Sequence, residues 1–107
     1  MRNLFVHGAR LDGELRARLI GRAPAWIPAT LHGYIRRRGR YYHIVAEAGG
    51  EVAGLVLTCI AAPELALLDI YEEVPKLYTR ELVTVRTGAG MPLAAWCYLP
   101  AGAGRVD

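Results

Sequence analysis

The chain has 107 residues, a length typical of one domain, and 53% of them are apolar, so it can bury a substantial core. No segment approaches the roughly 20 consecutive apolar residues of a membrane span, and the first residues do not resemble a signal peptide. The net charge of +3 conceals an asymmetry, because nine arginines and two acidic residues fall in residues 1–40, whereas residues 41–107 carry more acidic than basic side chains. We expect a single domain over residues 1–107, with a frayed tail at 101–107.

The two cysteines, Cys59 and Cys97, lie far apart in strand-like sequence and lack the spacing of metal ligands. Two buried thiols in a reducing compartment are the interpretation we favour, and a disulfide stays open. On this basis we expect a cytoplasmic protein, and we expect neither a metal ion nor a cofactor.

Apolar runs in chain order predict six strands, at residues 3–7, 27–37, 41–46, 52–60, 78–87 and 93–99. The run at 52–60 is almost continuously apolar, which predicts a central strand that is buried on both faces. Glycines predict turns between the strands at 48–51 and at 87–92. Trp26 and Trp96 flank predicted strands or lie in them, and we expect both in the core or in a pocket wall.

Two helices are predicted between these strands. The first should begin at Asp12 or Gly13 and end at Gly21, and the second should begin at Pro63 and end before Pro75. Strands joined mostly by hairpin turns, with two short helices inserted, indicate an α+β fold built on a small, mixed, mostly antiparallel barrel-like sheet.

The second helix carries an apolar stripe that ends in a cluster of carboxylates. On a 3.6-residue period, Leu65, Leu68 and Glu72 share one ridge, whereas Asp69 and Glu73 should see more water. An adjoining apolar ridge contains Leu67, Ile70, Tyr71 and Val74. Burial of a carboxylate among apolar side chains favours its protonated form, which suits acid–base catalysis near neutral pH. Glu72 is therefore the catalytic candidate, and a solvated residue at the helix edge is the alternative.

The segment 36–40 contains four arginines around one glycine. Such a run could contact phosphates, but a solvated hairpin rim is the interpretation we favour over nucleic-acid binding. No zinc ligands, helix-turn-helix pattern or aromatic RNA-binding motif accompanies it.

Seven short blocks follow one another in a specific order: Leu-Phe-Val-His-Gly at 4–8, Leu-Ile-Gly-Arg at 19–22, Pro-Ala-Thr-Leu-His-Gly-Tyr at 28–34, Gly-Glu-Val-Ala-Gly-Leu-Val at 50–56, Leu-Asp-Ile-Tyr-Glu at 68–72, Leu-Tyr-Thr-Arg at 77–80 and Ala-Trp-Cys-Tyr at 95–98. Together they resemble the gamma-glutamylcyclotransferase-like family, which includes gamma-glutamylamine cyclotransferase-like proteins. The resemblance covers nearly the whole chain, and the blocks at 68–72 and 77–80 carry most of it.

The resemblance implies a small mixed barrel with helices packed around it. It also implies an enzyme that cyclises a gamma-glutamyl group to 5-oxoproline and releases the attached amine or amino acid. In this family the glutamate of the Asp-x-Tyr-Glu block acts as general acid and base, which assigns that role to Glu72. The substrate would be a small molecule with a gamma-glutamyl group, and neither a metal nor a membrane is implied.

A loop after the first strand holds substrate oxygens in this family, usually with the sequence Tyr-Gly-Ser/Thr-Leu. The corresponding residues here are His7, Gly8, Ala9 and Arg10, of which only Gly8 keeps the pattern. Arg10 could grip a substrate carboxylate, giving an altered substrate preference. Alternatively the loop has lost this role, and the domain is a catalytically inactive module that binds a small metabolite or a protein. Tyr78 is a further substrate-binding candidate, although an aromatic core is the interpretation we favour for both Tyr78 and Tyr98.

Overall fold

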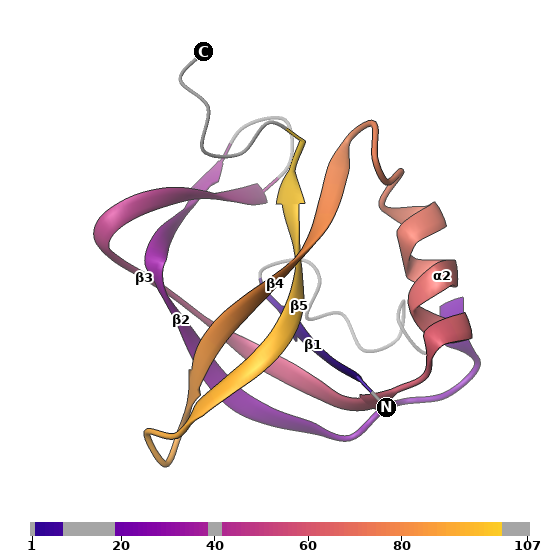
Figure 1. The fold of residues 1–107 in the computed structure, drawn as a ribbon, viewed down its shortest axis with the longest axis horizontal. Coiled ribbons are helices and arrows are strands. Elements are labelled where there is room, and N and C mark those ends of the chain that lie inside the picture. The colour runs from indigo at the N-terminus through magenta and orange to yellow at the C-terminus, as the bar shows by residue number, and fades with distance from the viewer. Residues whose placement is uncertain (1, 8–18, 39–41, 102–107) are drawn as a thin grey trace.

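The computed structural model describes residues 2–7, 19–38 and 42–101. Within these ranges five strands and the helix α2 form the fold (Figure 1). The elements are β1 (Arg2–Val6), β2 (Trp26–Arg38), β3 (Tyr42–Ile60), α2 (Ala62–Tyr71), β4 (Tyr78–Thr87) and β5 (Pro92–Pro100). Among the residues so described, no helix is long and apolar enough to cross a membrane.

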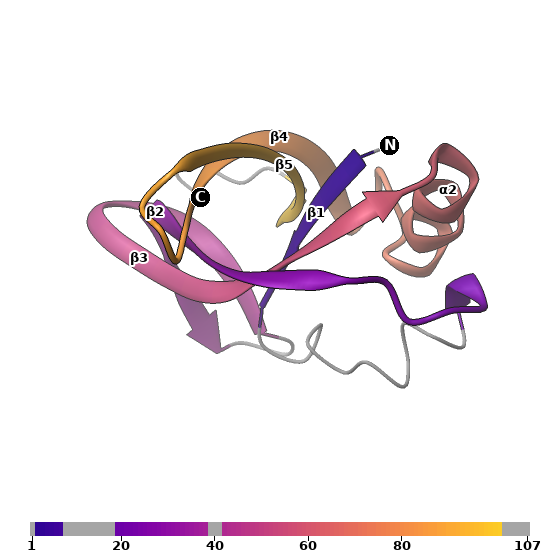
Figure 2. The same cartoon turned by 90° about the horizontal axis from the view of Figure 1, so that it is seen from below.

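The five strands close into a barrel in the order β1-β3-β2-β4-β5. The seam between β1 and β5 is parallel and aligns Leu4 with Trp96 and Phe5 with Cys97, whereas every other strand pair within the described barrel is antiparallel. Helix α2 lies against the outside of the barrel, beside the end of β3 (Figure 2). The predicted α+β class and mixed, mostly antiparallel barrel are therefore confirmed.

Strand β3 runs without interruption for 19 residues, so the predicted turn at 48–51 is wrong, as is the division into two strands. The chain bends there instead. Gly49 has a φ of 80° and Gly33 on the neighbouring strand has a φ of 87°, and the register between β2 and β3 shifts between His32 and Tyr34. Glycine reaches this left-handed region without a steric penalty, so it serves a bulge as readily as a turn. The bend lets Ile44, which is fully buried, join the barrel core.

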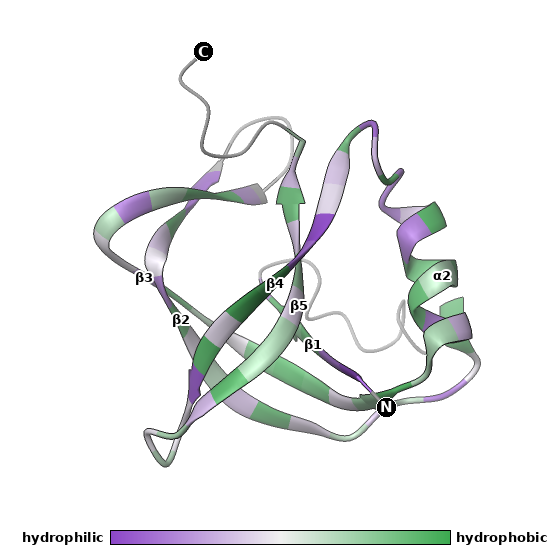
Figure 3. Cartoon of the chain, viewed as in Figure 1, coloured by the Kyte–Doolittle hydropathy of each residue, from purple (hydrophilic) through white to green (hydrophobic). Residues whose placement is uncertain are grey.

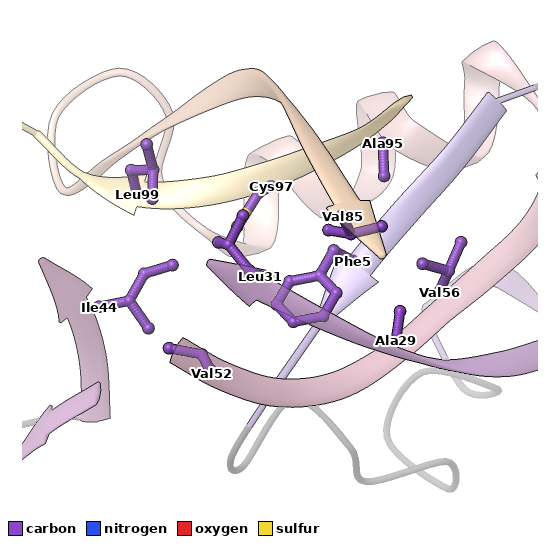
Figure 4. Packing of buried hydrophobic residues seen from close by; sticks show 10 residues of the cluster. All are labelled: Phe5, Ala29, Leu31, Ile44, Val52, Val56, Val85, Ala95, Cys97 and Leu99. Carbon is purple, nitrogen blue, oxygen red and sulfur yellow. The ribbon is translucent and has the colours of Figure 1, made fainter. Parts of the chain in front are cut away.

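Alternate residues of the strands build two separate cores. The first fills the barrel and contains Phe5, Ala29, Leu31, Ile44, Val52, Val56, Val85, Ala95, Cys97 and Leu99 (Figure 4). The second lies between the barrel and α2 and contains Leu4, Val6, Leu57, Ile60, Leu65, Leu68, Tyr78 and Tyr98. Consecutive side chains of a strand point to opposite faces, so β1 sends Phe5 inward and Leu4 outward toward the helix. The same alternation is visible as changes of hydropathy along β4 and β5 (Figure 3).

Two burial predictions are wrong, and for Trp26 one of the two alternatives is excluded. The 52–60 segment is central in the sheet but is not buried on both faces, because Ala53 and Cys59 are exposed. Only Cys97 is buried, and the two cysteines do not form a disulfide. Trp26 is 55% exposed and so is not a core residue, because it lies at the very start of β2.

Most of the predicted first helix lies outside the described residues, as does the tail beyond Ala101. Leu19 and Ile20 are helical, and Gly21 follows them with a φ of 81°, which matches the predicted helix end. In the second helix, Pro63 occupies the first turn as predicted.

Candidate functional site

Glu72 lies at the C-terminal end of α2 with only 7% of its surface exposed. It continues the ridge of Leu65 and Leu68, whose side chains pack in the second core. The adjoining ridge behaves differently, since Leu67 is 48% exposed and Ile70 is 75% exposed. The helix thus buries a single narrow stripe, and the buried end of that stripe is a carboxylate.

The backbone around Glu72 is held by a closed helix end. The N–H of Glu73 donates to the carbonyl of Ile70 at 3.1 Å, and the N–H of Val74 donates to the carbonyl of Asp69 at 3.0 Å. This pair of bonds is a Schellman motif, in which the residue after the C-cap takes a left-handed conformation. Glu73 has a φ of 54° and points to solvent, so the turn carries the chain away from the barrel directly after Glu72.

Asp69 is partly buried, with 23% of its side chain exposed, although its position on the helix beside Glu73 suggested that it faces solvent. Its carboxylate accepts two hydrogen bonds from Arg80, from Nε to Oδ1 at 2.8 Å and from Nη2 to Oδ2 at 3.1 Å. The hydroxyl of Tyr98 donates a third bond to Oδ1 at 2.7 Å. The three partners come from α2, β4 and β5, and we call them the Asp69–Arg80–Tyr98 network.

The ionisation of Tyr98 is strongly perturbed by its surroundings. Burial raises the pKa of its phenol well above the ordinary range, and the hydrogen bond to Asp69 and the negative charge of that carboxylate raise the same pKa further. The Arg80 charge opposes these effects, whereas the Glu72 charge adds to them. The hydroxyl therefore stays protonated and remains a donor at physiological pH. Glu72 also acts electrostatically on the same phenol as Asp69.

Arg80 connects this network to an aromatic ring. Its guanidinium carbon lies 4.6 Å from the centre of the Trp96 ring, within the range of a cation–π contact. Its side chain is 24% exposed and that of Asp69 is 23% exposed, so the ion pair lies at the edge of the second core. Trp96 itself packs partly buried against this core, which agrees with its predicted place in the core or in a pocket wall.

His7 is only 2% exposed and follows the last residue of β1. Its ring stacks on that of Phe5, with the ring centres 6.2 Å apart and the planes at 29°. Gly8, Ala9 and Arg10 lie outside the described residues. Tyr78 is 6% exposed and packs in the second core with Leu65.

The structure thus brings Glu72 and Tyr78 to the interface between α2 and the barrel, whereas His7 lies at the end of β1. Sequence reasoning missed Asp69 and Arg80. The sequence contained one indication of this pair, the arginine at position 80 that follows the Asp-x-Tyr-Glu block. An arginine that binds a carboxylate with two hydrogen bonds needs an acidic partner nearby. Among the described residues, no three His, Cys, Asp or Glu side chains are grouped to hold a metal ion.

Solved structures share this fold. The chain superposes on the solution structure of one Arabidopsis thaliana protein with a TM-score of 0.84, at 29% identity, over 97% of this chain and 64% of the other. A second Arabidopsis thaliana protein gives a TM-score of 0.85 at 31% identity, over 99% and 71%. A structure called gamma-glutamyl cyclotransferase gives 0.79 at 21% identity, over 92% and 66%, and shares the fold. The fold is therefore that of the gamma-glutamylcyclotransferase-like proteins.

The sequence places the chain within this class. The model of the family described as gamma-glutamyl cyclotransferase, AIG2-like, matches residues 4–106, and the chain belongs to that family. A Methanocaldococcus jannaschii protein named gamma-glutamylcyclotransferase and putative RNase is 29% identical over 100 residues, which are 91% of this chain and 45% of that protein. Protein AIG2 C of Arabidopsis thaliana is 33% identical over 97 residues, 79% of this chain and 59% of that protein. The chain spans about half the length of these curated relatives.

Proposed function

We propose that this protein cyclises a gamma-glutamyl amine or peptide to 5-oxoproline and releases the amine, with Glu72 as general acid and base. The observation that carries the proposal is the burial of the Glu72 carboxylate at the end of an otherwise apolar helix ridge. A buried carboxylate is shielded from bulk water, which suits proton transfer between two groups of one bound substrate. Membership of the family supplies the class of reaction.

The proposed reaction needs only a proton shuttle. The neutral α-amine of the glutamyl group attacks its own γ-carbonyl carbon, forming the ring C–N bond. Collapse of the tetrahedral intermediate breaks the bond between that carbon and the leaving amine. Glu72 takes the proton from the attacking nitrogen and gives it to the leaving nitrogen, so the products are 5-oxoproline and the free amine. Water is not consumed, and no atom is oxidised or reduced.

Positioning accounts for the rest of the acceleration. Amine and carbonyl belong to one flexible chain, so binding the glutamyl group in a folded conformation removes much of the entropic cost of ring closure. We propose that His7, Gly8, Ala9 and Arg10 hold the substrate and that Tyr78 contributes to the wall of the site. Arg10 in place of an apolar residue favours a substrate with an additional carboxylate.

The same loop favours a second candidate, a binding module without catalysis. His7 stands where the family has a tyrosine, and its ring is buried against Phe5. Ala9 removes a hydroxyl that the family uses. Both changes would be tolerated if the domain only bound a small metabolite or a protein.

A release assay separates the two candidates. The protein is incubated with a panel of gamma-glutamyl amines and dipeptides, and 5-oxoproline is measured. Glu72→Gln should reduce release at least about 100-fold, the usual contribution of a general acid–base group, while the neighbouring exposed variant Glu73→Gln should stay within about twofold. Equal release by wild type and Glu72→Gln would contradict the role of Glu72. Absence of release across the panel, with thermal stabilisation by one of its members, would favour the binding module.

We also propose a cytoplasmic location. The two cysteines, which both fall among the described residues, do not form a disulfide, and reduced thiols are typical of that compartment.

A further inference from the structure

We propose that Asp69 is a positioning residue, which acts through its hydrogen bonds to Arg80 and Tyr98 to hold the end of α2, and with it Glu72, in the orientation needed for proton transfer. The inference rests on the function proposed above. It assigns a task to three residues that the proposed reaction does not otherwise use.

The network fixes the helix end from two directions. Arg80 belongs to β4 and Tyr98 belongs to β5, and these residues pair directly across the two strands. Their donors therefore stand side by side on one rigid hairpin, and both reach the same carboxylate at distances of 2.7 to 3.1 Å. Hydrogen bonds to a charged group are directional and about twice as strong as neutral ones. Asp69 is consequently held against the barrel at a defined distance and rotation.

Asp69 is tied to the helix end by its backbone as well as by its side chain. Its carbonyl accepts the N–H of Val74 and so closes the Schellman motif in which Glu72 is the C-cap. Any rotation of Asp69 away from the β4–β5 hairpin would loosen this motif and move Glu72, three residues further along. The side-chain bonds of Asp69 thus control the backbone that presents Glu72.

Apolar packing cannot supply the same constraint. Leu65 and Leu68 keep α2 against the barrel, but the hydrophobic effect is not directional and tolerates small shifts of the helix. Proton transfer between two substrate nitrogens does not tolerate such shifts, because a displacement of about 1 Å can cost about 100-fold in rate. The guanidinium of Arg80 and the phenol of Tyr98 supply directional hydrogen bonds, which the leucines cannot form.

Tyr98 is suited to be the permanent donor of the network. Its hydroxyl is held at 2.7 Å from Asp69, and burial and the adjacent carboxylate raise its pKa far beyond physiological pH. The hydroxyl therefore remains a hydrogen-bond donor near neutral pH. Phenylalanine at this position removes one donor and leaves the ring, which makes Tyr98→Phe a conservative probe.

The first test compares steady-state kinetics of wild type, Asp69→Asn and Tyr98→Phe on a gamma-glutamyl substrate that wild type turns over. Asp69→Asn should lower kcat by about 10- to 100-fold with KM changed less than about threefold, because Glu72 is displaced and the substrate contacts are not. The control is Glu73→Gln, which removes the same charge from the same helix end without touching the network, and it should stay within about twofold. The double variant Asp69→Ala with Tyr98→Phe should be no slower than Asp69→Ala alone, because alanine already removes the oxygen that accepts the Tyr98 hydroxyl.

The second test reads the position of the helix end without activity. Amide hydrogen exchange should accelerate by about tenfold at Glu72 and Val74 in Asp69→Asn, while Leu65 in the same helix exchanges as in wild type. Unchanged exchange at Glu72 and Val74 would overturn the inference, because the network would then not hold the helix end. Equal acceleration at all three amides would also overturn it, because the network would then stabilise the whole helix and not its end in particular.

The two proposals fail in different ways. If wild type releases 5-oxoproline and Glu72→Gln does not, but Asp69→Asn keeps its kcat, the positioning role is wrong and the proposed function stands. If wild type releases no 5-oxoproline from any substrate, the proposed function fails and the positioning role fails with it.

Discussion

Arg22 forms a bidentate ion pair with Glu64, in which Nε donates to Oε2 at 2.6 Å and Nη2 donates to Oε1 at 2.7 Å. The same Nη2 also donates to the carbonyl of Cys59 at 2.8 Å, at the end of β3. Glu64 in turn accepts the N–H of Ala61, which caps the start of α2. One glutamate therefore joins the helix start, the end of the central strand and the segment that precedes β2.

This arrangement predicts a pH-dependent stability. The hydrogen bond from Arg22, followed by that from Ala61, lowers the pKa of Glu64 from 4.5 to about 2. Because the folded pKa is the lower one, the stabilisation is complete above about pH 4.5 and is lost as the pH falls through about 2. Glu64→Gln should therefore melt below wild type near neutral pH, and the difference should shrink as the pH approaches 2.

Thermal unfolding across this pH range checks the prediction. The matched control is Glu81→Gln, which removes an exposed carboxylate from β4 and should show a small difference that does not follow this pH pattern. A gap between Glu64→Gln and wild type that stayed constant from neutral pH to pH 2 would exclude the ion pair as its cause.

Local patterns predicted the fold well wherever one face of an element was buried. The bounds of β4 agree with the sequence, and the ridge of Leu65 and Leu68 indicated the buried position of Glu72. The bend in β3 was mistaken for a turn, since a glycine with positive φ is compatible with both structures. Only the pairing with β2, which is not a local property, distinguishes them.

The candidate site was less predictable for the same reason. The partners of Asp69 lie 11 and 29 residues away along the chain, so no periodicity of α2 reveals them. The position of Asp69 on the helix beside Glu73 suggested that its side chain faces solvent. The β4–β5 hairpin instead supplies two hydrogen-bond donors, Arg80 and Tyr98, on that side of the helix. The roles of His7, Gly8, Ala9 and Arg10 stay predictions.

Gly54 permits the close approach of β3 to the end of β1. A Cβ at this position would clash with the carbonyl oxygen of Val6 and would lie 2.8 Å from Cζ of Phe5. Gly54→Ala should therefore lower the free energy of unfolding by about 1–3 kcal/mol, the usual cost of overpacking. Gly88→Ala adds the same methyl group where nothing lies within 4 Å, and it should change stability by less than about 0.5 kcal/mol. Urea unfolding measures both, and equal effects would contradict the close approach.

The two leucine ridges of α2 should respond differently to truncation. Leu68 is 5% exposed and packs in the second core, whereas Leu67 next to it is 48% exposed. Leu68→Ala should cost about 2–4 kcal/mol through the lost contacts and the cavity, and Leu67→Ala should cost less than about 1 kcal/mol. Similar losses in urea unfolding would mean that the helix is rotated about its axis relative to this structure, which would also move Glu72 out of the buried ridge.

The two thiols should differ in reactivity because only one meets solvent. Cys59 is exposed near the end of β3, whereas Cys97 is fully buried in the barrel core. A thiol reagent must reach the sulfur, so Cys59 should react in the native protein and Cys97 only after unfolding. Colorimetric titration with an aromatic disulfide should therefore count one thiol in buffer and two in denaturant. Cys59→Ser should abolish the native reaction, and Cys97→Ser should leave it intact. A fast reaction that survived in Cys59→Ser would show that the barrel opens readily around β5, the strand that carries Tyr98.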